Sequence, residues 1–144
     1  MNYTKTVFLK NSLACAFLVY AALLFLPLAQ ANDLSGTSKQ VVTQLIEAMD
    51  ANDAEKIRSL FSADATQEYE RWWSRKKKGD KFREWLESDI VSVHGRVNNP
   101  EIKASGQEVV VTGTYENNDD YSSPANFLLT VENERITSWT MRYD

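Results

Sequence analysis

Few side chains in this 144-residue chain could perform acid–base chemistry. His94 is the single histidine, and its free imidazole, with a pKa of about 6.5, could act as a general acid or base. Asp64 and Glu68 could divide acid and base roles if burial raised the pKa of one of them. Each residue also fits a structural role, in a helix-to-strand junction, a turn or a solvated surface. The catalytic residues therefore stay unknown, with His94, Asp64 and Tyr69 as candidates.

Metal chemistry has little support in the composition. One histidine and one cysteine exclude multi-histidine motifs and cysteine-based zinc clusters. Residues 117–120, Asn-Asn-Asp-Asp, could bind a hard cation, but they lack EF-hand spacing and are interpreted as a solvated loop. We expect neither a metal nor a cofactor.

The strongest charge pattern is the basic segment, residues 71–83, with seven basic residues and one acidic residue. This concentration, with Trp72 and Trp73 beside it, suggests recognition of an anionic partner, either the charged end of a ligand or an anionic membrane surface. A solvated loop is the alternative of equal weight. The candidate residues for the anionic partner are Arg71, Arg75, Lys76, Lys77, Lys78 and Lys81.

The N-terminal segment, residues 1–31, has the pattern of a secretory signal peptide. Lys5 and Lys10 precede an apolar run over residues 13–28, and Ala29-Gln30-Ala31 forms a cleavage site. An uncleaved membrane anchor is the rival interpretation, but this run is shorter than the roughly 20 residues that a spanning helix needs. We expect cleavage after Ala31 and an exported chain, periplasmic or secreted. Because such a protein has little access to nucleic acid, we expect no nucleic-acid partner.

The expected elements are helices first and strands afterwards. Apolar residues at helical spacing predict a first helix capped by Thr37 and a second capped by Asp53, which ends over residues 62–65. A third begins at Asp80 and buries Trp85 and Asp89 among other residues. Residues 66–73 are either a short strand or irregular. Alternation predicts strands at 90–98, 100–105, 108–116, 125–132 and 135–143. This order predicts an α+β domain.

This order resembles the nuclear transport factor 2-like superfamily, in its SnoaL-like and ketosteroid isomerase-like group. The resemblance rests on residues 53–65, the helix start at 79–86 and the closing residues 135–139 and 143–144. It covers residues 38–144 and implies a SnoaL-like domain over 32–144. The implied fold is a cone, with three N-terminal helices on a curved, mainly antiparallel sheet and a pocket between them. Such folds often pair through the open sheet face, so a homodimer is compatible with the resemblance.

The resemblance does not carry the isomerase chemistry with it. The positions that match the family's catalytic tyrosine, general-base aspartate and hydrogen-bonding aspartate are Leu45, Tyr69, and Asn126 or Phe127. None keeps the required group, and a phenol with a free pKa of about 10 is a poor base near neutral pH. These departures argue against ketosteroid isomerase activity and favour binding over catalysis.

The many aromatic residues could line an apolar ligand cavity. The leading hypothesis is an exported, non-catalytic domain that binds a small or amphipathic, and conceivably anionic, molecule between the helices and the sheet. An isomerase-, dehydratase- or cyclase-type enzyme using the same pocket stays open. So does an envelope module that docks through the basic segment. The candidate ligand-binding residues are Tyr69, Trp72, Trp73, Phe127, Trp139 and Met141.

Overall fold

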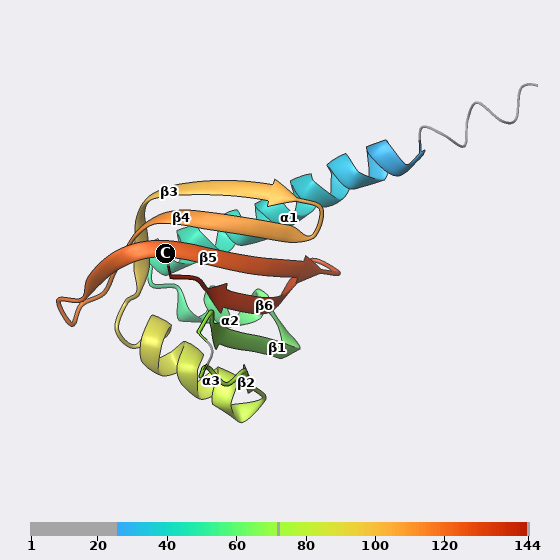
Figure 1. Cartoon of the computed structure of the whole chain (residues 1–144). Helices are drawn as coiled ribbons and strands as arrows, with labels where there is room; N and C mark the ends of the chain where they lie inside the picture. The colour runs from blue at the N-terminus through green and yellow to red at the C-terminus, as the bar shows by residue number, and fades with distance from the viewer. Residues whose placement is uncertain (1–25, 72, 144) are drawn as a thin grey trace, which may run out of the picture.

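An apolar stripe along one side of the first helix anchors it to the rest of the domain. In the computed structural model, which describes residues 26–71 and 73–143, helix α1 (Leu26–Asp50) buries Val42, Leu45 and Met49 completely. It crosses behind β3 (Arg96–Ser105), β4 (Glu108–Glu116) and β5 (Ser122–Glu132) and extends past the sheet (Figure 1). Most of the expected leader, residues 1–25, lies outside the described residues.

The predicted N-cap at Thr37 is wrong, because α1 begins before it. Residues 32–37 contain no proline that would stop a helix. Ser35, two residues before the predicted start, contacts the turn at residues 106–107 of the sheet, since its hydroxyl accepts a hydrogen bond from the Gly106 amide at 2.7 Å. In the part of the chain that is described, no helix is long and apolar enough to span a bilayer.

The second helix has the predicted cap but is shorter than predicted. Asp53 accepts a hydrogen bond from the Lys56 amide at the start of α2 (Ala54–Ser59). Residues 62–65 do not end this helix; they belong to strand β1 (Phe61–Tyr69). Ala65 and Gln67 on this strand are buried, and the strand pairs with β6 in parallel. Pairing with a distant strand therefore overrides the local helical pattern.

The third helical segment changes its winding. Helix α3 (Asp80–Leu86) has Gly79 as its N-cap, where Asp80 was predicted, and it buries Phe82, Trp85 and Leu86. It continues into a π-helix, η1 (Glu87–Val91), in which the Ser92 amide donates to the Glu87 carbonyl. Arg58 of α2 holds Glu87 through two hydrogen bonds of 2.5 and 2.8 Å. The start of η1 is thereby tied to α2.

The sheet has six strands in the order β2-β1-β6-β5-β4-β3. Neighbouring strands are antiparallel except for the parallel pair β1–β6. The expected strands at 90–98 and 100–105 are one strand, β3, with an irregularity between Asn98 and Glu101. This strand begins later than predicted, at Arg96, because residues 87–91 belong to η1. The remaining strands are β2 (Lys77–Lys78), β3 (Arg96–Ser105), β4 (Glu108–Glu116), β5 (Ser122–Glu132) and β6 (Arg135–Met141).

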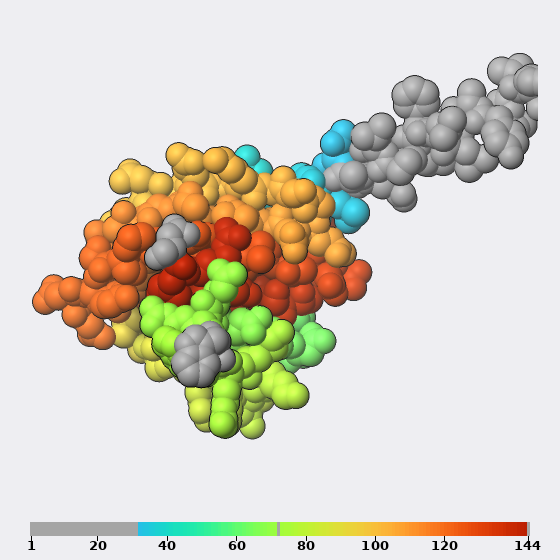
Figure 2. Space-filling view, viewed as in Figure 1, coloured from blue at the N-terminus to red at the C-terminus, as the bar shows by residue number. Residues whose placement is uncertain are grey.

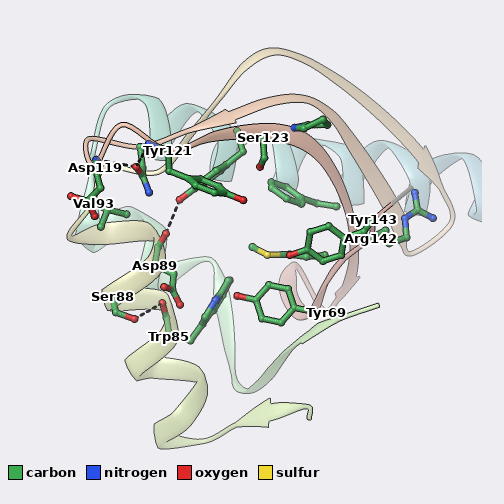
Figure 3. Close-up of a pocket in the computed structure, with 15 residues that line it drawn as sticks. Tyr69, Trp85, Ser88, Asp89, Val93, Asp119, Tyr121, Ser123, Arg142 and Tyr143 are labelled. Atoms are coloured by element: carbon green, nitrogen blue, oxygen red, sulfur yellow. Dashed lines mark hydrogen bonds between the residues drawn. The ribbon is translucent and has the colours of Figure 1, made fainter. Parts of the chain in front are cut away.

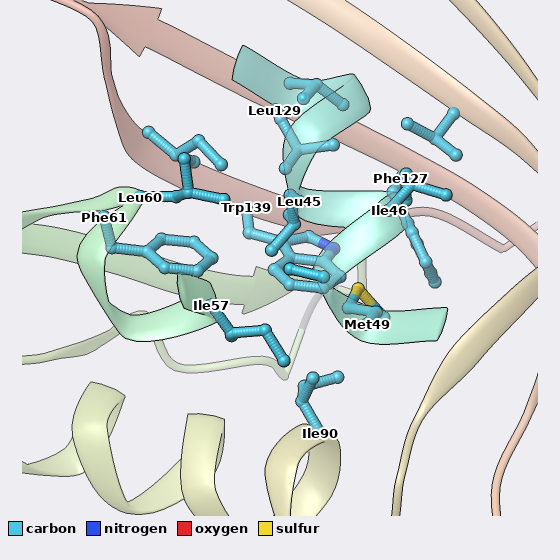
Figure 4. Close-up of a cluster of buried hydrophobic side chains, with 14 of the residues drawn as sticks. Leu45, Ile46, Met49, Ile57, Leu60, Phe61, Ile90, Phe127, Leu129 and Trp139 are labelled. Atoms are coloured by element: carbon cyan, nitrogen blue, oxygen red, sulfur yellow. The ribbon is translucent and has the colours of Figure 1, made fainter. Parts of the chain in front are cut away.

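The core lies between the helices and the inner face of the sheet, and its centre is Trp139 of β6 (Figure 4). The Trp139 ring packs edge-on against Trp85 and Phe127, both with centroids 5.2 Å away. Phe61 stacks parallel to it at 6.1 Å. This α+β arrangement, with helices against one face of a curved, mainly antiparallel sheet, confirms the predicted fold class.

Candidate functional site

A cavity of about 320 Å³ opens between η1 and the inner face of the sheet (Figure 3). Its walls come from β1, the α3–η1 helix, the ends of β4, β5 and β6, the β4–β5 loop and the residues that follow β6. The lining residues are Tyr69, Trp85, Ser88, Asp89, Val93, Tyr115, Asn117, Asp119, Tyr121, Ser123, Pro124, Phe127, Met141, Arg142 and Tyr143.

The π-helix supplies the acidic part of one wall. Ser88 and Asp89 line the cavity from η1, and the Tyr115 hydroxyl of β4 donates to the Asp89 carbonyl at 2.7 Å. Asp89 was predicted to lie on the buried side of the third helix, and that prediction is wrong: its side chain is exposed at the cavity. The wider π turn rotates the residues after Leu86 relative to an α-helix, a feature often found at functional sites.

Aromatic rings form most of the remaining wall. Tyr115 contacts Phe127 and Tyr121, with ring centroids 6.3 and 6.1 Å apart. Tyr69 and Tyr143 stack at 6.1 Å on the other side of the opening. Burial, followed by smaller effects that include the charge of Asp89, raises the pKa of Tyr115 to about 12. The pKa values of Tyr69 and Tyr143 are also raised, chiefly by burial, so these phenols stay neutral near pH 7.

One buried donor in the wall lacks an acceptor. The Trp85 side chain is 2% exposed, and its Nε1–H forms no hydrogen bond of normal geometry. It faces the Tyr69 hydroxyl (Figure 3) closely enough to lower the pKa of that phenol, an effect smaller than the increase caused by burial. A buried polar group without a partner costs free energy, on the order of 1–3 kcal/mol. A small shift of the Tyr69 side chain that improved this geometry would recover it.

The lining contains two acidic side chains, Asp89 and Asp119, and one basic side chain, Arg142. Asp89 and Asp119 form no ion pair among the described residues. The Arg142 guanidinium donates twice to the Asn126 side-chain oxygen, at 2.9 and 2.6 Å. The cavity therefore holds two unpaired carboxylates and one cation that is already hydrogen-bonded.

The predicted ligand-binding residues divide into three groups. Tyr69, Phe127 and Met141 line the cavity. Trp139 lies deeper, in the core, with 1% of its surface exposed. Trp73 is 59% exposed and lies outside the lining, and Trp72 lies outside the described residues.

The catalytic candidates do not converge on the cavity. Tyr69 lines it, whereas Asp64 is exposed on β1 and does not. His94 lies at the junction of η1 and β3 in a left-handed backbone conformation, with Nε2 2.9 Å from the Asp50 carbonyl. Of the remaining positions compared with the isomerases, Leu45 is buried in the core and Asn126 accepts the Arg142 hydrogen bonds.

The basic segment borders the cavity at its tyrosine pair. The Arg71 guanidinium lies 4.2 Å from the ring centre of Tyr143, and Lys77 Nζ lies 4.6 Å from that of Tyr69. Lys77 also donates to Gln67 at 2.9 Å. Lys76 lies 3.4 Å from Glu68. Arg75, Lys78 and Lys81 are exposed, and the segment forms a continuous surface beside the C-terminal residues (Figure 2).

Sequence reasoning missed much of the wall, including Ser88, Asp89, Tyr115, Tyr121 and Arg142. One signal was available: Tyr115 and Tyr121 flank the polar loop at residues 117–120. Two aromatic residues on either side of an Asn/Asp loop suggest that this loop packs beside an apolar surface.

Several solved structures share this fold. A nuclear transport factor 2-like protein of unknown function from Cytophaga hutchinsonii is 15% identical, with a TM-score of 0.62 over 74% of this chain and 89% of its own. A nuclear transport factor 2-like protein from Burkholderia xenovorans is 21% identical, with a TM-score of 0.57 over 76% and 91%. An LEH-like epoxide hydrolase from M. tuberculosis is 18% identical, with a TM-score of 0.59 over 76% and 84%.

These identities establish a shared fold and not a shared activity. No curated protein matches the chain by sequence. The model of the SnoaL-like domain matches residues 42–139, which span α1 to β6 and include most of the cavity wall. The chain is a member of the SnoaL-like domain family.

Proposed function

We propose that this domain binds a small, largely apolar, ring-containing molecule in the cavity beside η1. The aromatic lining of this cavity of about 320 Å³ carries the proposal, since Trp85, Tyr115 and Phe127 lie in one wall and Tyr69 and Tyr143 in the other. Aromatic walls with a few polar groups are typical of small-molecule sites. The ligand therefore has an apolar ring that packs between these side chains.

Binding is favoured over catalysis because His94 and Asp64 lie away from the cavity that holds Tyr69. One observation favours an isomerase-, dehydratase- or cyclase-type enzyme as the second candidate. The Tyr69 phenol and the Asp89 carboxylate line the same cavity, which offers a donor and a base to one substrate. Turnover that is lost in both Tyr69→Phe and Asp89→Asn would establish this alternative.

Native mass spectrometry after gentle purification, followed by a thermal-shift screen of aromatic metabolites and lipids, tests the binding proposal. We expect a bound molecule or a stabilising ligand, and a weaker effect in Trp85→Phe, which reduces the aromatic surface of the cavity wall. Trp73→Phe, on the exposed surface, is the matched control. An empty protein with no thermal shift across the screen would contradict the proposal.

The basic segment supports a third role, in docking to an anionic membrane surface. Trp73 is 59% exposed and lies 5.6 Å from the Arg71 guanidinium, and this pairing of an aromatic ring with a cation suits a membrane interface. Co-sedimentation with vesicles rich in anionic lipid should fall with salt and with Arg75→Glu/Lys78→Glu. Binding that is unchanged by both would exclude this role.

The proposed site of action is outside the cytoplasm. We propose that the leader at residues 1–31 is removed and that the mature chain starts at Asn32. N-terminal sequencing of protein recovered from the periplasm or medium of a bacterial host would show Asn32 first. A chain that keeps its leader in the membrane fraction would contradict this proposal.

A further inference from the structure

The two carboxylates of the cavity come from two different elements. Asp89 projects from η1 and Asp119 belongs to the β4–β5 loop. Arg142, the one basic residue of the lining, already gives two hydrogen bonds to Asn126. The field at this end of the cavity is therefore negative, and it disfavours ionisation of Tyr115 and Tyr69.

The aromatic rings in the wall can bind cations through their faces, within about 6 Å of a ring centre. The protein already uses two of them in this way from outside. Arg71 covers Tyr143, and Lys77 covers Tyr69. Among the described residues, no Lys or Arg side chain lies over the ring of Tyr115 or Tyr121 in this way, and the two rings meet at 59°. Tyr121 and Asp89 lie at the same end of the cavity (Figure 3), and the Tyr115 hydroxyl is hydrogen-bonded to the Asp89 carbonyl there.

We propose that the Asp89–Tyr115–Tyr121 end of the cavity binds an alkylammonium group of the ligand. This inference rests on the proposed small-molecule function and specifies the ligand's chemistry. The Asp89 carboxylate compensates the positive charge, and the Tyr115 and Tyr121 rings contact the alkyl groups on nitrogen. The ligand is thus an aromatic or alicyclic amine.

The positive charge of the basic segment lies at the other side of the cavity from the Asp89 end. The basic segment lies outside the cavity, behind Tyr69 and Tyr143. A cation that enters from solvent therefore meets repulsion at that edge and attraction at the end lined by Asp89 and Asp119. This asymmetry would set the direction in which the ligand lies.

Isosteric probes test the proposal directly. Benzyltrimethylammonium carries the cation, neopentylbenzene is its neutral carbon isostere, and benzenesulfonate carries the opposite charge. Calorimetry and chemical-shift changes at the Trp85 indole N–H would report binding to the full mature domain. We expect the cation to bind at least about fivefold more tightly than the neutral isostere, within the range of cation–π contacts.

Matched variants separate charge from fold. Asp89→Asn removes the carboxylate charge with little change in shape, and it should reduce the preference for the cation at least about threefold, while leaving neopentylbenzene unaffected. Asp64→Asn, an exposed position outside the cavity, should change neither affinity. Tyr121→Leu should weaken the cation more than the neutral probe.

Each alternative outcome has a distinct meaning. If the cation and the neutral isostere bind equally in the wild type, the alkylammonium inference is overturned and small-molecule binding stands. If benzenesulfonate binds most tightly, the inference is overturned in favour of an anionic ligand. If no probe shifts the Trp85 signal and the metabolite screen is also empty, both this inference and the proposed function fail.

Discussion

At the residue scale, Tyr115 links the sheet to the π-helix through one hydrogen bond. Its hydroxyl donates to the Asp89 carbonyl, so Tyr115→Phe leaves that partly buried carbonyl without its donor. We expect a loss of about 1 kcal/mol in the free energy of unfolding, the usual value for one hydrogen bond. Urea denaturation would measure it. Tyr121→Phe, at a position 53% exposed, should change stability by less than about 0.5 kcal/mol.

The same phenol predicts a loss of stability at alkaline pH. Burial raises the pKa of Tyr115 to about 12 in the folded chain, against 10.0 for an unperturbed tyrosine, so the folded state holds this proton more tightly than the unfolded state. The resulting stabilisation is complete below pH 10 and disappears as the pH rises towards about 12. Urea denaturation across this range should show a steeper loss for the wild type than for Tyr115→Phe. Equal slopes would contradict the assignment.

Part of the cavity could be predicted from residue types, and part could not. Aromatic character was enough to suggest Tyr69 and Phe127 as lining residues. It could not separate Met141 at the cavity from Trp139 in the core, because both belong to β6 and their difference depends on which rings cover them. The position of Asp89 at the cavity depends on the π turn of η1. The period of about 3.6 residues used in the sequence analysis places this residue on the buried side instead, beside Ile90.

At the element scale, the junction between η1 and β3 is packed directly against the cavity wall. A Cβ at Gly95 would lie 2.5 Å from the Tyr115 hydroxyl oxygen and 2.9 Å from its ring carbon Cε2. Gly95→Ala must therefore displace this ring, with an expected cost of about 1–3 kcal/mol and weaker binding of any cavity ligand. Urea denaturation and probe titration would measure the two effects.

Gly36→Ala is the matched control for this substitution. Gly36 lies within α1, and a Cβ there meets nothing within 4 Å. Alanine lowers the entropy of the unfolded chain and favours the helix, so this variant should gain about 0.5–1 kcal/mol. If Gly95→Ala were also neutral or stabilising, Tyr115 would be free to move and could not be a fixed wall.

The arrangement of elements was more predictable than their limits. Patterns with helical and alternating periods gave the α+β order and four of the strand regions. The end of α2 and the start of the parallel strand β1 were missed, and only the short-strand alternative at 66–73 overlaps β1, because the decisive contacts are distant in sequence. Phe61 pairs with Ile136, and Thr66 with Ser138, and no local pattern contains that information.

At the scale of the whole molecule, one face of the sheet has no helix against it in the described part of the chain (Figure 1). Its central row is uncharged, since Val110 pairs with Leu128 and Leu128 with Thr140 across three strands. All three side chains are partly exposed. At the two ends of this row lie Lys103 and Glu68. An uncharged centre with charged ends suits contact with a second copy of the same face.

We therefore predict a homodimer that forms through this open face. Leu128→Lys places a charge at its centre and should convert the dimer into a monomer, because an unpaired charge in an apolar interface costs several kcal/mol. Size-exclusion chromatography with light scattering would measure the mass. Ala51→Lys, at the exposed turn after α1 and away from this face, is the control and should stay dimeric. Circular dichroism would verify that Leu128→Lys is folded, and a monomeric wild type at high concentration would contradict the prediction.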